Sequence, residues 1–420
     1  MRLQSLKVIA SLLVAAAITV GCGGGSPAPA PTGLTAVASE STVTLTWDTT
    51  PGVEYWVFYA PTAFAPKDNS NMSRWFNLLG GAVLLNVRPP YTIAGLANAN
   101  SYSFTVNGRT GGGPGGPAAT TVSATPRLAG GTWTAGTTIS TQDFRGLAYG
   151  GSYIAVGTGG AIASSADATT WTNVTSPSTQ SLNGVAYFPS NVTTDGITTA
   201  TANYIAVGDA GTVLTTTGTA AWTSKTSGTA KNLYAVASNG LGLSVAVGAD
   251  GTIITSSDTT TWKPATSSGT TNDLRAVSSI SGTWYAAGTN GTLVKSTDGL
   301  TWTSVATGSA ANFYGITYGA STSTTAAVAF VLVGSGGTVL TSADAVTWTS
   351  QVLPGTSKLN AVVYGSQFVT VGDGGKIFTS TDAVTWTAVV TNNTSNLLTL
   401  ARGSYTYATA GVAGTNLTSK

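Results

Sequence analysis

The sequence predicts an all-β protein with two folded parts: a β-sandwich, followed by a seven-bladed β-propeller closed by an N-terminal strand around Trp133. One observation behind this is that short runs of alternating apolar and polar residues are separated by turn residues, which is typical of strands. Another is a Gly-x-x-Gly pair that recurs with a period of about 40 residues along the C-terminal two-thirds of the chain. The last is a Trp that follows each of the first six pairs, always 14 positions after the first Gly. Such a period is that of a propeller blade of four short strands.

Composition sets limits on function. The chain has 420 residues, enough for several domains, and contains no histidine. Only 8% of residues are charged, against roughly 25% in an average soluble protein. The 17 basic and 15 acidic residues form no block of like charge. This pattern gives no electrostatic footprint for nucleic acid, so we expect no nucleic-acid partner.

The first residues predict a signal peptide over residues 1–21. Arg2 and Lys7 precede an apolar run that is too short to span a bilayer comfortably, and small residues follow it. The segment Thr19-Val20-Gly21-Cys22 resembles a bacterial lipobox, in which cleavage before the Cys leaves a lipidated N-terminus. The alternative is an ordinary secretory signal followed by an idle cysteine. Cys22 is the one cysteine of the chain, so no disulfide forms within it.

The resemblance to lipoproteins implies a cell-envelope location with attachment to the membrane through the N-terminal lipid. Gly23 rather than Asp follows the cysteine, which by lipoprotein sorting rules favours the outer membrane. Residues 22–30 contain three glycines and then alternating proline, and we expect them to form a lipidated flexible tether. Removal of Arg2 and Lys7 leaves 15 basic residues against 15 acidic ones, so attachment would depend on the lipid alone.

Residues 31–126 are expected to form the sandwich, because roughly seven short strand-like runs occur in this segment. They resemble the fibronectin type III family, with Trp47 at the place of its core Trp and with Leu96 and Tyr102 at the spacing of its tyrosine corner. The segment from Pro61 to Pro90 is longer than usual in that family and contains Trp75. It is either a recognition loop or additional core, and we favour core.

Residues 130–420 are expected to form the propeller. Each repeat contains an inner strand, a second strand that ends at the first Gly, a third strand after the Gly-x-x-Gly turn, and a fourth strand that carries the Trp. The two residues between the glycines predict a tight hairpin with positive φ. A seventh pair, Gly411 and Gly414, has no Trp after it, and Trp133 precedes the first repeat without a pair of its own. We therefore expect the seventh blade to be split between the two ends of the domain.

A second motif precedes the Trp in most repeats and reads Ser-x-Asp-x-x-Thr-Trp or a close variant. It resembles the Asp-box of sialidase-like (BNR) propellers, and Gly218 replaces its Asp in the second repeat. We expect a structural turn, in which the carboxylate accepts backbone N–H groups, rather than a metal site, because the carboxylates occur one per blade. The motif aspartates are Asp167, Asp258, Asp298, Asp344 and Asp382.

The two motifs together, as in Ala155-Val156-Gly157 to Trp171, are similar to those of the propeller family of photosystem II assembly and stability factors. Members of that family are binding scaffolds and not enzymes, so the resemblance implies a non-catalytic scaffold. The sandwich domain and the lipobox argue against a photosystem role. We therefore expect a scaffold with a different binding partner from that of the family.

The inventory of reactive groups also argues against catalysis, and no cofactor or metal is expected. The two glutamates, Glu40 and Glu54, both lie outside the repeat domain, so the glutamate of a sialidase is missing. Without histidine, neither a Ser-His-Asp triad nor a metal site containing His is possible. The alternative is an atypical polysaccharide-acting hydrolase that pairs propeller aspartates. The aspartates outside the turn motif are Asp143, Asp195, Asp209, Asp250, Asp273 and Asp373.

Binding is expected where the repeat varies. In the inner strands, the position after the first Leu or Phe is polar or aromatic in six of seven repeats, and a ring of these residues near the propeller axis suits an acidic peptide or a glycan. The alternative is that these residues only face solvent in the channel. Two inserts, 190–202 and 319–328, are further candidates. We expect a scaffold for an envelope protein or a surface polysaccharide. The ring residues are Arg145, Asn183, Tyr234, Arg275, Tyr314 and Asn360, with Leu398 in the seventh repeat.

Overall fold

The computed structural model describes residues 25–194, 197–219, 221–322 and 328–419, with no side-chain description for residues 190–202 and Val328. Cys22, Asp195 and the middle of the second insert therefore lie outside the described residues. The chain divides into two compact units, unit 1 up to Leu128 and unit 2 from Ala129. Both units are all-β, as predicted, and the described part of the chain has no α-helix, only short 3₁₀ turns.

Unit 1 consists of a three-stranded and a four-stranded antiparallel sheet. Residues of both sheets, among them Leu45, Trp47 and Phe104, form one buried core. The Tyr102 hydroxyl accepts a hydrogen bond from the backbone N–H of Ala97 at 3.2 Å, which ties the loop before the strand to the strand itself. The first sheet contains β1 (Thr35–Ser39), β2 (Thr42–Thr46) and β5 (Tyr91–Ala94). The second contains β4 (Ala82–Leu84), β3 (Glu54–Pro61), β6 (Tyr102–Arg109) and β7 (Val122–Ala124).

The long segment from Pro61 to Pro90 packs as additional core. It contains β4 and the 3₁₀ turn η1 (Met72–Trp75). Trp75 is fully buried in a small cluster with Phe58 and Ala60 on the outer face of β3. Its Nε1 donates to Asn69 Oδ1 at 3.2 Å, and Asn69 Nδ2 donates to the carbonyl oxygen of Ala119 at 2.8 Å. The segment therefore covers a sheet face that would otherwise expose aromatic residues.

The predicted flexible tether is shorter than expected. Ser26 and Ala28 donate backbone hydrogen bonds to the carbonyls of Thr110 and Gly108, at 3.2 and 3.3 Å. Ala28 is buried against the sheet. The proline-containing part of the segment is extended, as predicted, but it lies along β6 because its backbone N–H groups find acceptors there. The tether prediction is thus wrong for residues 25–28.

Unit 2 contains seven four-stranded antiparallel sheets in its described residues. Sheet 1 contains β9 (Phe144–Tyr149), β10 (Tyr153–Gly157), β11 (Ile162–Ser165) and β12 (Thr172–Val174). Sheet 2 contains β13 (Leu182–Thr194), β14 (Ile197–Gly208), β15 (Val213–Thr217) and β16 (Trp222–Lys225). Sheet 3 contains β17 (Leu233–Ser238), β18 (Ser244–Gly248), β19 (Ile253–Ser256) and β20 (Lys263–Pro264). Sheet 4 contains β21 (Leu274–Ile280), β22 (Thr283–Gly288), β23 (Leu293–Ser296) and β24 (Thr303–Ser304). Sheet 5 contains β25 (Phe313–Ala320), β26 (Val328–Gly334), β27 (Val339–Ser342) and β28 (Thr349–Gln351). Sheet 6 contains β29 (Leu359–Tyr364), β30 (Phe368–Gly372), β31 (Ile377–Ser380) and β32 (Thr387–Val389). Sheet 7 contains β33 (Leu397–Arg402), β34 (Tyr407–Gly411), β35 (Asn416–Ser419) and β8 (Thr134–Ala135).

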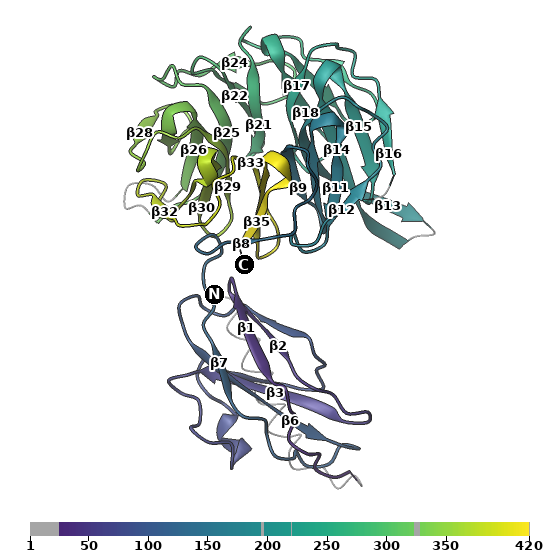
Figure 1. The fold of residues 1–420 in the computed structure, drawn as a ribbon, viewed down its shortest axis with the longest axis vertical. Coiled ribbons are helices and arrows are strands. Elements are labelled where there is room, and N and C mark those ends of the chain that lie inside the picture. The colour runs from purple at the N-terminus through teal and green to yellow at the C-terminus, as the bar shows by residue number, and fades with distance from the viewer. Residues whose placement is uncertain (1–24, 195–196, 220, 323–327, 420) are drawn as a thin grey trace. The chain divides into compact units, whose positions relative to one another are not determined.

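The first strands of the seven sheets follow one another in a ring. Each contacts the first strand of the next sheet, and β33 contacts β9. Figure 1 shows the C-terminal β33 and β35 between β29 and β9. β8 pairs with β35, so the seventh sheet contains both ends of unit 2. Trp133 precedes β8, and its Nε1 donates to the Gly130 carbonyl at 2.7 Å, as Trp302 donates to Gly299 in sheet 4 at 3.0 Å.

The Gly-x-x-Gly segments are longer turns than the two-residue hairpin we predicted. Six of the seven are 3₁₀ turns: η2 (Thr158–Gly160), η3 (Asp209–Gly211), η4 (Ala249–Gly251), η5 (Ser335–Gly337), η6 (Asp373–Gly375) and η7 (Val412–Gly414). Positive φ occurs at the third and fourth positions, for example 64° at Gly159 and 76° at Gly160. The first Gly is extended, with φ of −163° at Gly157. A Cβ there would overlap the carbonyl oxygen of Asp143, so this Gly is required by close backbone approach.

The Ser-x-Asp motifs form tight turns between the third and fourth strands. In sheet 4, one carboxylate oxygen of Asp298 accepts the N–H groups of Leu300 and Thr301, at 2.8 and 2.9 Å, and also the Ser296 hydroxyl at 2.8 Å. Asp167, Asp258, Asp344 and Asp382 make the same bonds in their sheets. The N–H groups of Thr301 and Leu300 hold the pKa of Asp298 below its usual value.

This lowered pKa predicts acid sensitivity. Backbone N–H groups lower the pKa of Asp258 and Asp344 as well. These carboxylates therefore contribute their full stabilisation above about pH 5 and lose it as the pH falls further. We expect the urea midpoint of unfolding to fall steadily between about pH 5 and pH 2. In Asp298→Asn, the midpoint should be lower at neutral pH and should fall less in acid. A midpoint that stays constant over this range would contradict the prediction.

Candidate functional site

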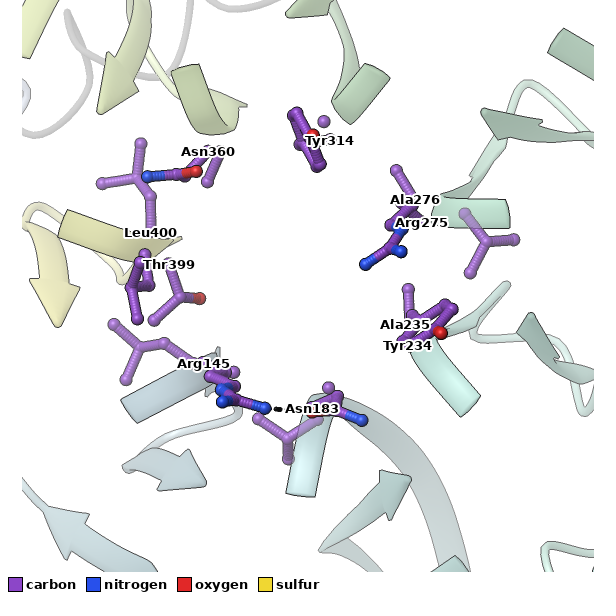
Figure 2. A pocket seen from close by; sticks show the side chains of 18 of the residues that line it. Arg145, Asn183, Tyr234, Ala235, Arg275, Ala276, Tyr314, Asn360, Thr399 and Leu400 are labelled. Atoms are coloured by element: carbon purple, nitrogen blue, oxygen red, sulfur yellow. Dashed lines mark hydrogen bonds between the residues drawn. The ribbon is translucent and has the colours of Figure 1, made fainter. Parts of the chain in front are cut away.

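A cavity of unit 2 lies inside the ring of first strands and has a volume of about 690 Å³. It opens on the side of the Gly-x-x-Gly turns, since Asp209 of η3 lines it. Figure 2 shows side chains from all seven sheets arranged around one open space. All predicted ring residues line this cavity: Arg145, Asn183, Tyr234, Arg275, Tyr314, Asn360 and Leu398.

A β-bulge in each first strand explains why these side chains reach the cavity. In sheet 3, Leu233 pairs with Gly248 and Ala235 pairs with Val247, so Tyr234 between them has no partner on β18. The same register shift leaves the ring residue unpaired in the other six sheets. A bulge inserts one extra residue and re-aims its side chain. The seven positions that the sequence singles out all line the cavity, but the sequence carries no clear signal of the bulge.

Two residues further along each strand, an apolar ring forms the floor of the cavity. Its members are aliphatic in every sheet, and six of them are buried. The cavity is therefore polar where it opens and apolar at its base, which is the usual distribution in a binding pocket. The floor residues are Leu147, Val185, Val236, Val277, Ile316, Val362 and Leu400.

The polar ring is organised in pairs that join neighbouring sheets. The guanidinium of Arg275 lies 4.2 Å from the ring centroid of Tyr234, and the ammonium of Lys358 lies 4.1 Å from that of Tyr314. Arg145 Nη1 donates to Asn183 Oδ1 at 3.0 Å, as the dashed line in Figure 2 shows. Cation–π contacts of this kind hold a cation in place, and Arg275 is also paired with the Asp273 carboxylate at 2.9 Å.

Lys358 is the one cation of this ring that the sequence did not predict. It occupies the position directly before the first strand, where five of the seven sheets have Asp or Asn. Those side chains accept an N–H from the turn of the preceding sheet: in sheet 3, Asn232 Oδ1 accepts from Ala210 at 2.9 Å. Lys358 breaks that pattern, and this break is the signal that could have identified it. Because it makes no such bond, its side chain is available to line the cavity.

The surroundings of Lys358 lower the pKa of its ammonium group. Burial lowers the pKa of its ammonium group, the Asp373 carboxylate opposes this shift, and the nearby Arg275 guanidinium lowers the pKa further. Among the cavity-lining residues, three cations stand against the single carboxylate of Asp209. Outside the lining, the Asp273 carboxylate pairs with Arg275 at 2.9 Å and so balances part of this positive charge.

Asn183 and Asn360 also make structural hydrogen bonds that the sequence did not predict. Asn360 Nδ2 donates to Asp373 Oδ1 and to the carbonyl of Leu397 in the next sheet, both at 2.8 Å. Asn183 makes the equivalent pair of bonds, to Asp209 Oδ1 at 2.8 Å and to the carbonyl of Leu233 at 3.0 Å. Their amides thus join adjacent sheets, and only part of each side chain remains available to a ligand.

Because the Asn360 amide joins two sheets, we expect its removal to lower the stability of unit 2 and to leave ligand binding nearly unchanged. In Asn360→Ala, the Asp373 carboxylate and the Leu397 carbonyl would lose a donor, which should lower the free energy of unfolding by about 1–3 kcal/mol. The affinity of the cavity for an acidic peptide should change by less than about twofold, because no cation is removed. Chemical denaturation and peptide titration measure the two quantities. Weaker binding with unchanged stability would show instead that Asn360 contacts the ligand.

The two inserts lie away from the cavity mouth, at the far ends of the first strands. Residues 190–194 and 197–202 extend the β13–β14 hairpin, and residues 195–196 lie outside the described residues. At the start of the other insert, Ser321 Oγ donates to the carbonyl of Asp382 at 2.8 Å and thereby meets the turn of sheet 6. The next residue, Thr322, donates its N–H to the carbonyl of Thr381 at 3.0 Å, and residues 323–327 are not described. The described residues of the two inserts do not contribute to the cavity lining.

The aspartates outside the turn motif form ion pairs with neighbouring side chains or accept hydrogen bonds from them and from the backbone. Asp273 pairs with Arg275 at 2.9 Å, Asp250 with Lys231 at 2.6 Å, and Asp143 accepts the N–H of Ala413. Within the described ranges, no group of three or more acidic, His or Cys side chains is placed to hold a metal ion. The same residues contain no helix of membrane-spanning length and hydropathy.

Comparison with known proteins defines the class of fold. The chain matches no family model and no curated protein. Among solved structures, it resembles YCF48 bound to D1 peptide (TM-score 0.54, 16% identity, covering 68% of this chain and 94% of the other). It also resembles YCF48 from Cyanidioschyzon merolae (TM-score 0.52, 16% identity, 68% and 98%) and the WD40 β-propeller domain of Doa1 (TM-score 0.53, 11% identity, 69% and 97%). The fold is therefore propeller-like, as the repeat predicted.

Proposed function

We propose that this protein is a non-catalytic binding or assembly scaffold, and that the cavity of unit 2 takes an acidic segment of a protein partner. The observation that carries the proposal is the cation set of the cavity. Arg145 of β9, Arg275 of β21 and Lys358, directly before β29, line one space. The lining carboxylate of Asp209 is bonded to Asn183, and Asp273 pairs with Arg275 from outside the lining. Guanidinium and ammonium groups bind carboxylates through charge-assisted hydrogen bonds.

The structural comparisons support a protein partner in general terms. YCF48 has been solved with a D1 peptide bound, so a propeller-like protein of similar fold takes a peptide. At 16% identity the likeness concerns the fold alone, and the identity of the partner does not carry over. The chemistry of the partner is argued instead from the cations of this chain.

A surface polysaccharide is the weaker candidate for this cavity. Sugars stack on open aromatic faces, but Arg275 and Lys358 cover one face of Tyr234 and of Tyr314. The polysaccharide-hydrolase alternative would need a pair of free carboxylates, one of them with a raised pKa. Asp209, Asp273 and Asp373 are instead bonded to Asn183, Arg275 and Asn360. No observation favours catalysis over binding.

The proposal includes the architecture and the location predicted from the sequence. Seven four-stranded sheets, the last completed by β8, support a seven-bladed propeller. The three-plus-four sheet pattern of unit 1 and the Ala97–Tyr102 hydrogen bond support a fibronectin type III-like sandwich. We further propose a signal peptide over residues 1–21, lipidation at Cys22 and anchoring in the outer membrane, which rest on the lipobox-like sequence alone.

The binding function is tested with defined peptides. Fluorescent hexaglutamate, capped at both ends to remove terminal charges, should bind the full chain, with an affinity that falls as salt is added. Hexaglutamine and hexalysine peptides with the same caps are matched controls and should bind at least about tenfold more weakly. Fluorescence anisotropy measures all three. Equal affinity for the three peptides would refute an anion-selective cavity.

A further inference from the structure

We propose that one end of unit 1 faces the lipid bilayer. Unit 1 itself, rather than a flexible tether, then sets the distance between the membrane and the point where the chain leaves unit 1. This surface, the near end, is formed by residues 48–52 and 110–113. The inference rests on the proposed lipidation of Cys22 and identifies which part of the protein that anchor holds against lipid.

The chain is fixed to unit 1 almost directly after the cysteine. Gly25 lies against the backbone of Gly111 and Gly113, where a Cβ on Gly113 would overlap Gly25. Ser26 exchanges backbone hydrogen bonds with Thr110, at 3.2 and 3.0 Å, and its hydroxyl lies 3.0 Å from that of Thr110. These contacts add a short extended segment along the end of β6.

Chain length then limits how far the anchor can lie from this end. Two residues, Gly23 and Gly24, separate Cys22 from Gly25. Three residue steps reach at most about 11 Å even when fully extended. A lipidated Cys22 lies at the headgroup level of the membrane, so the near end must lie within that distance of the bilayer surface.

The loop between β2 and β3 lies at the same end. Glu54 at the start of β3 pairs with Arg109 at the end of β6, and Asp48 donates its N–H to the carbonyl of Thr32 at 2.9 Å. The exposed residues of this loop, such as Thr49 and Gly52, are mostly small and uncharged. Such a surface can approach lipid headgroups without removing many charges from water.

The chain leaves unit 1 at the opposite end, the far end, formed by residues 97–101 and 126–127. β7 pairs with β6 at Tyr102–Phe104, and the N–H of Ala99 donates to the carbonyl of Pro126 at 2.7 Å. β6 has 8 residues, which at about 3.3 Å each span roughly 25 Å. Unit 1 is therefore a spacer whose strands separate its anchored end from its exit.

Energy transfer to the membrane tests this arrangement. The full-length protein is purified from membranes, its N-terminal acylation is verified by mass, and it is reconstituted in vesicles containing an acceptor-labelled headgroup. Because Cys22 is the one native cysteine, a donor dye can be placed on Thr49→Cys at the near end or on Asn100→Cys at the far end. We expect transfer from the Thr49→Cys position to be at least about twofold more efficient, since the ends differ by roughly 25 Å.

Two tether variants sharpen the test. A Gly-Ser linker of about 20 residues inserted between Gly24 and Gly25, with an r.m.s. length of roughly 25 Å, should lower transfer from Thr49→Cys and reduce the difference between the two positions. Gly113→Val should act in the same direction by displacing Gly25. If Gly113→Val does not fold, the linker variant alone decides.

The outcomes distinguish this inference from the function on which it rests. Acylated protein that shows equal transfer from both positions overturns the orientation of unit 1 and leaves the lipid anchor standing. Protein without acyl chains that does not float with vesicles overturns both. Transfer that is unaffected by the inserted linker shows that the native segment does not set the distance, and it also overturns the inference.

Discussion

Replacing Arg275 and Lys358 together by alanine is expected to weaken binding of capped hexaglutamate by at least about 100-fold. Both cations line the cavity, and each is held over a tyrosine ring of the neighbouring sheet. A hydrogen bond to a charged group contributes about 1.5–3 kcal/mol, so the loss of two should remove most of the affinity. Anisotropy titration of wild type and variant at the same salt concentration measures the change.

Lys263→Ala is the control for the removal of one positive charge, as in each of the two replacements, and Lys263 lies on the exposed strand β20, outside the cavity lining. It should leave the affinity unchanged to within about twofold. Arg145→Ala should have an intermediate effect, since Arg145 is more exposed and hydrogen-bonds to Asn183. Thermal unfolding of each variant checks that the fold is retained. A double variant that is folded and binds as tightly as wild type would exclude the cavity as the peptide site.

Gly288→Ala is expected to destabilise unit 2 by about 3 kcal/mol or more, or to prevent folding. Gly288 is the first Gly of its turn, and an added Cβ would overlap the carbonyl oxygen of Asp273 and lie 2.9 Å from the Cα of Leu274. Both atoms belong to the backbone where the first strand begins, so neither can move without shifting that strand. Urea denaturation measures the loss in free energy of unfolding.

The matched control is Gly336→Ala in sheet 5, at the third position of the turn. Its φ is 63°, but nothing lies within 4 Å of the place that a Cβ would occupy, and alanine already stands at the equivalent position at Ala210 and Ala413 with φ of 52°. We expect a cost of about 1 kcal/mol or less. Equal destabilisation by the two substitutions would show that positive φ, and not backbone approach, makes these glycines necessary.

The repeat made much of unit 2 predictable from the sequence. The fixed interval between the first Gly and the Trp marks where the second, third and fourth strands lie, because a short antiparallel hairpin has a characteristic length. The unpaired Trp133 indicated that the two ends of the domain share one sheet, and β8 pairs with β35. The ring positions could be found because they vary while their neighbours stay apolar.

Other parts of the site could not be predicted because they depend on contacts between sheets. The bulge that exposes Tyr234 is a matter of register between two strands. The bonds of Asn360 to Asp373 and Leu397 join residues that are adjacent only after the ring closes. Lys358 could not be predicted from the strand pattern, because it precedes the strand at a position that normally holds a turn-capping Asp or Asn.

By itself, the sequence determined the all-β class, the period of the repeat and which positions vary, since these follow from local turn chemistry and from the alternation of apolar residues. Only the tertiary structure decided that these variable positions form one cavity, that Lys358 joins them and that Asn183 and Asn360 join sheets. It also decided that residues 25–28 lie along β6. The physical reason is that backbone turns are specified by neighbouring residues, whereas charge and hydrogen-bond acceptors are brought together by strands that are distant in the chain.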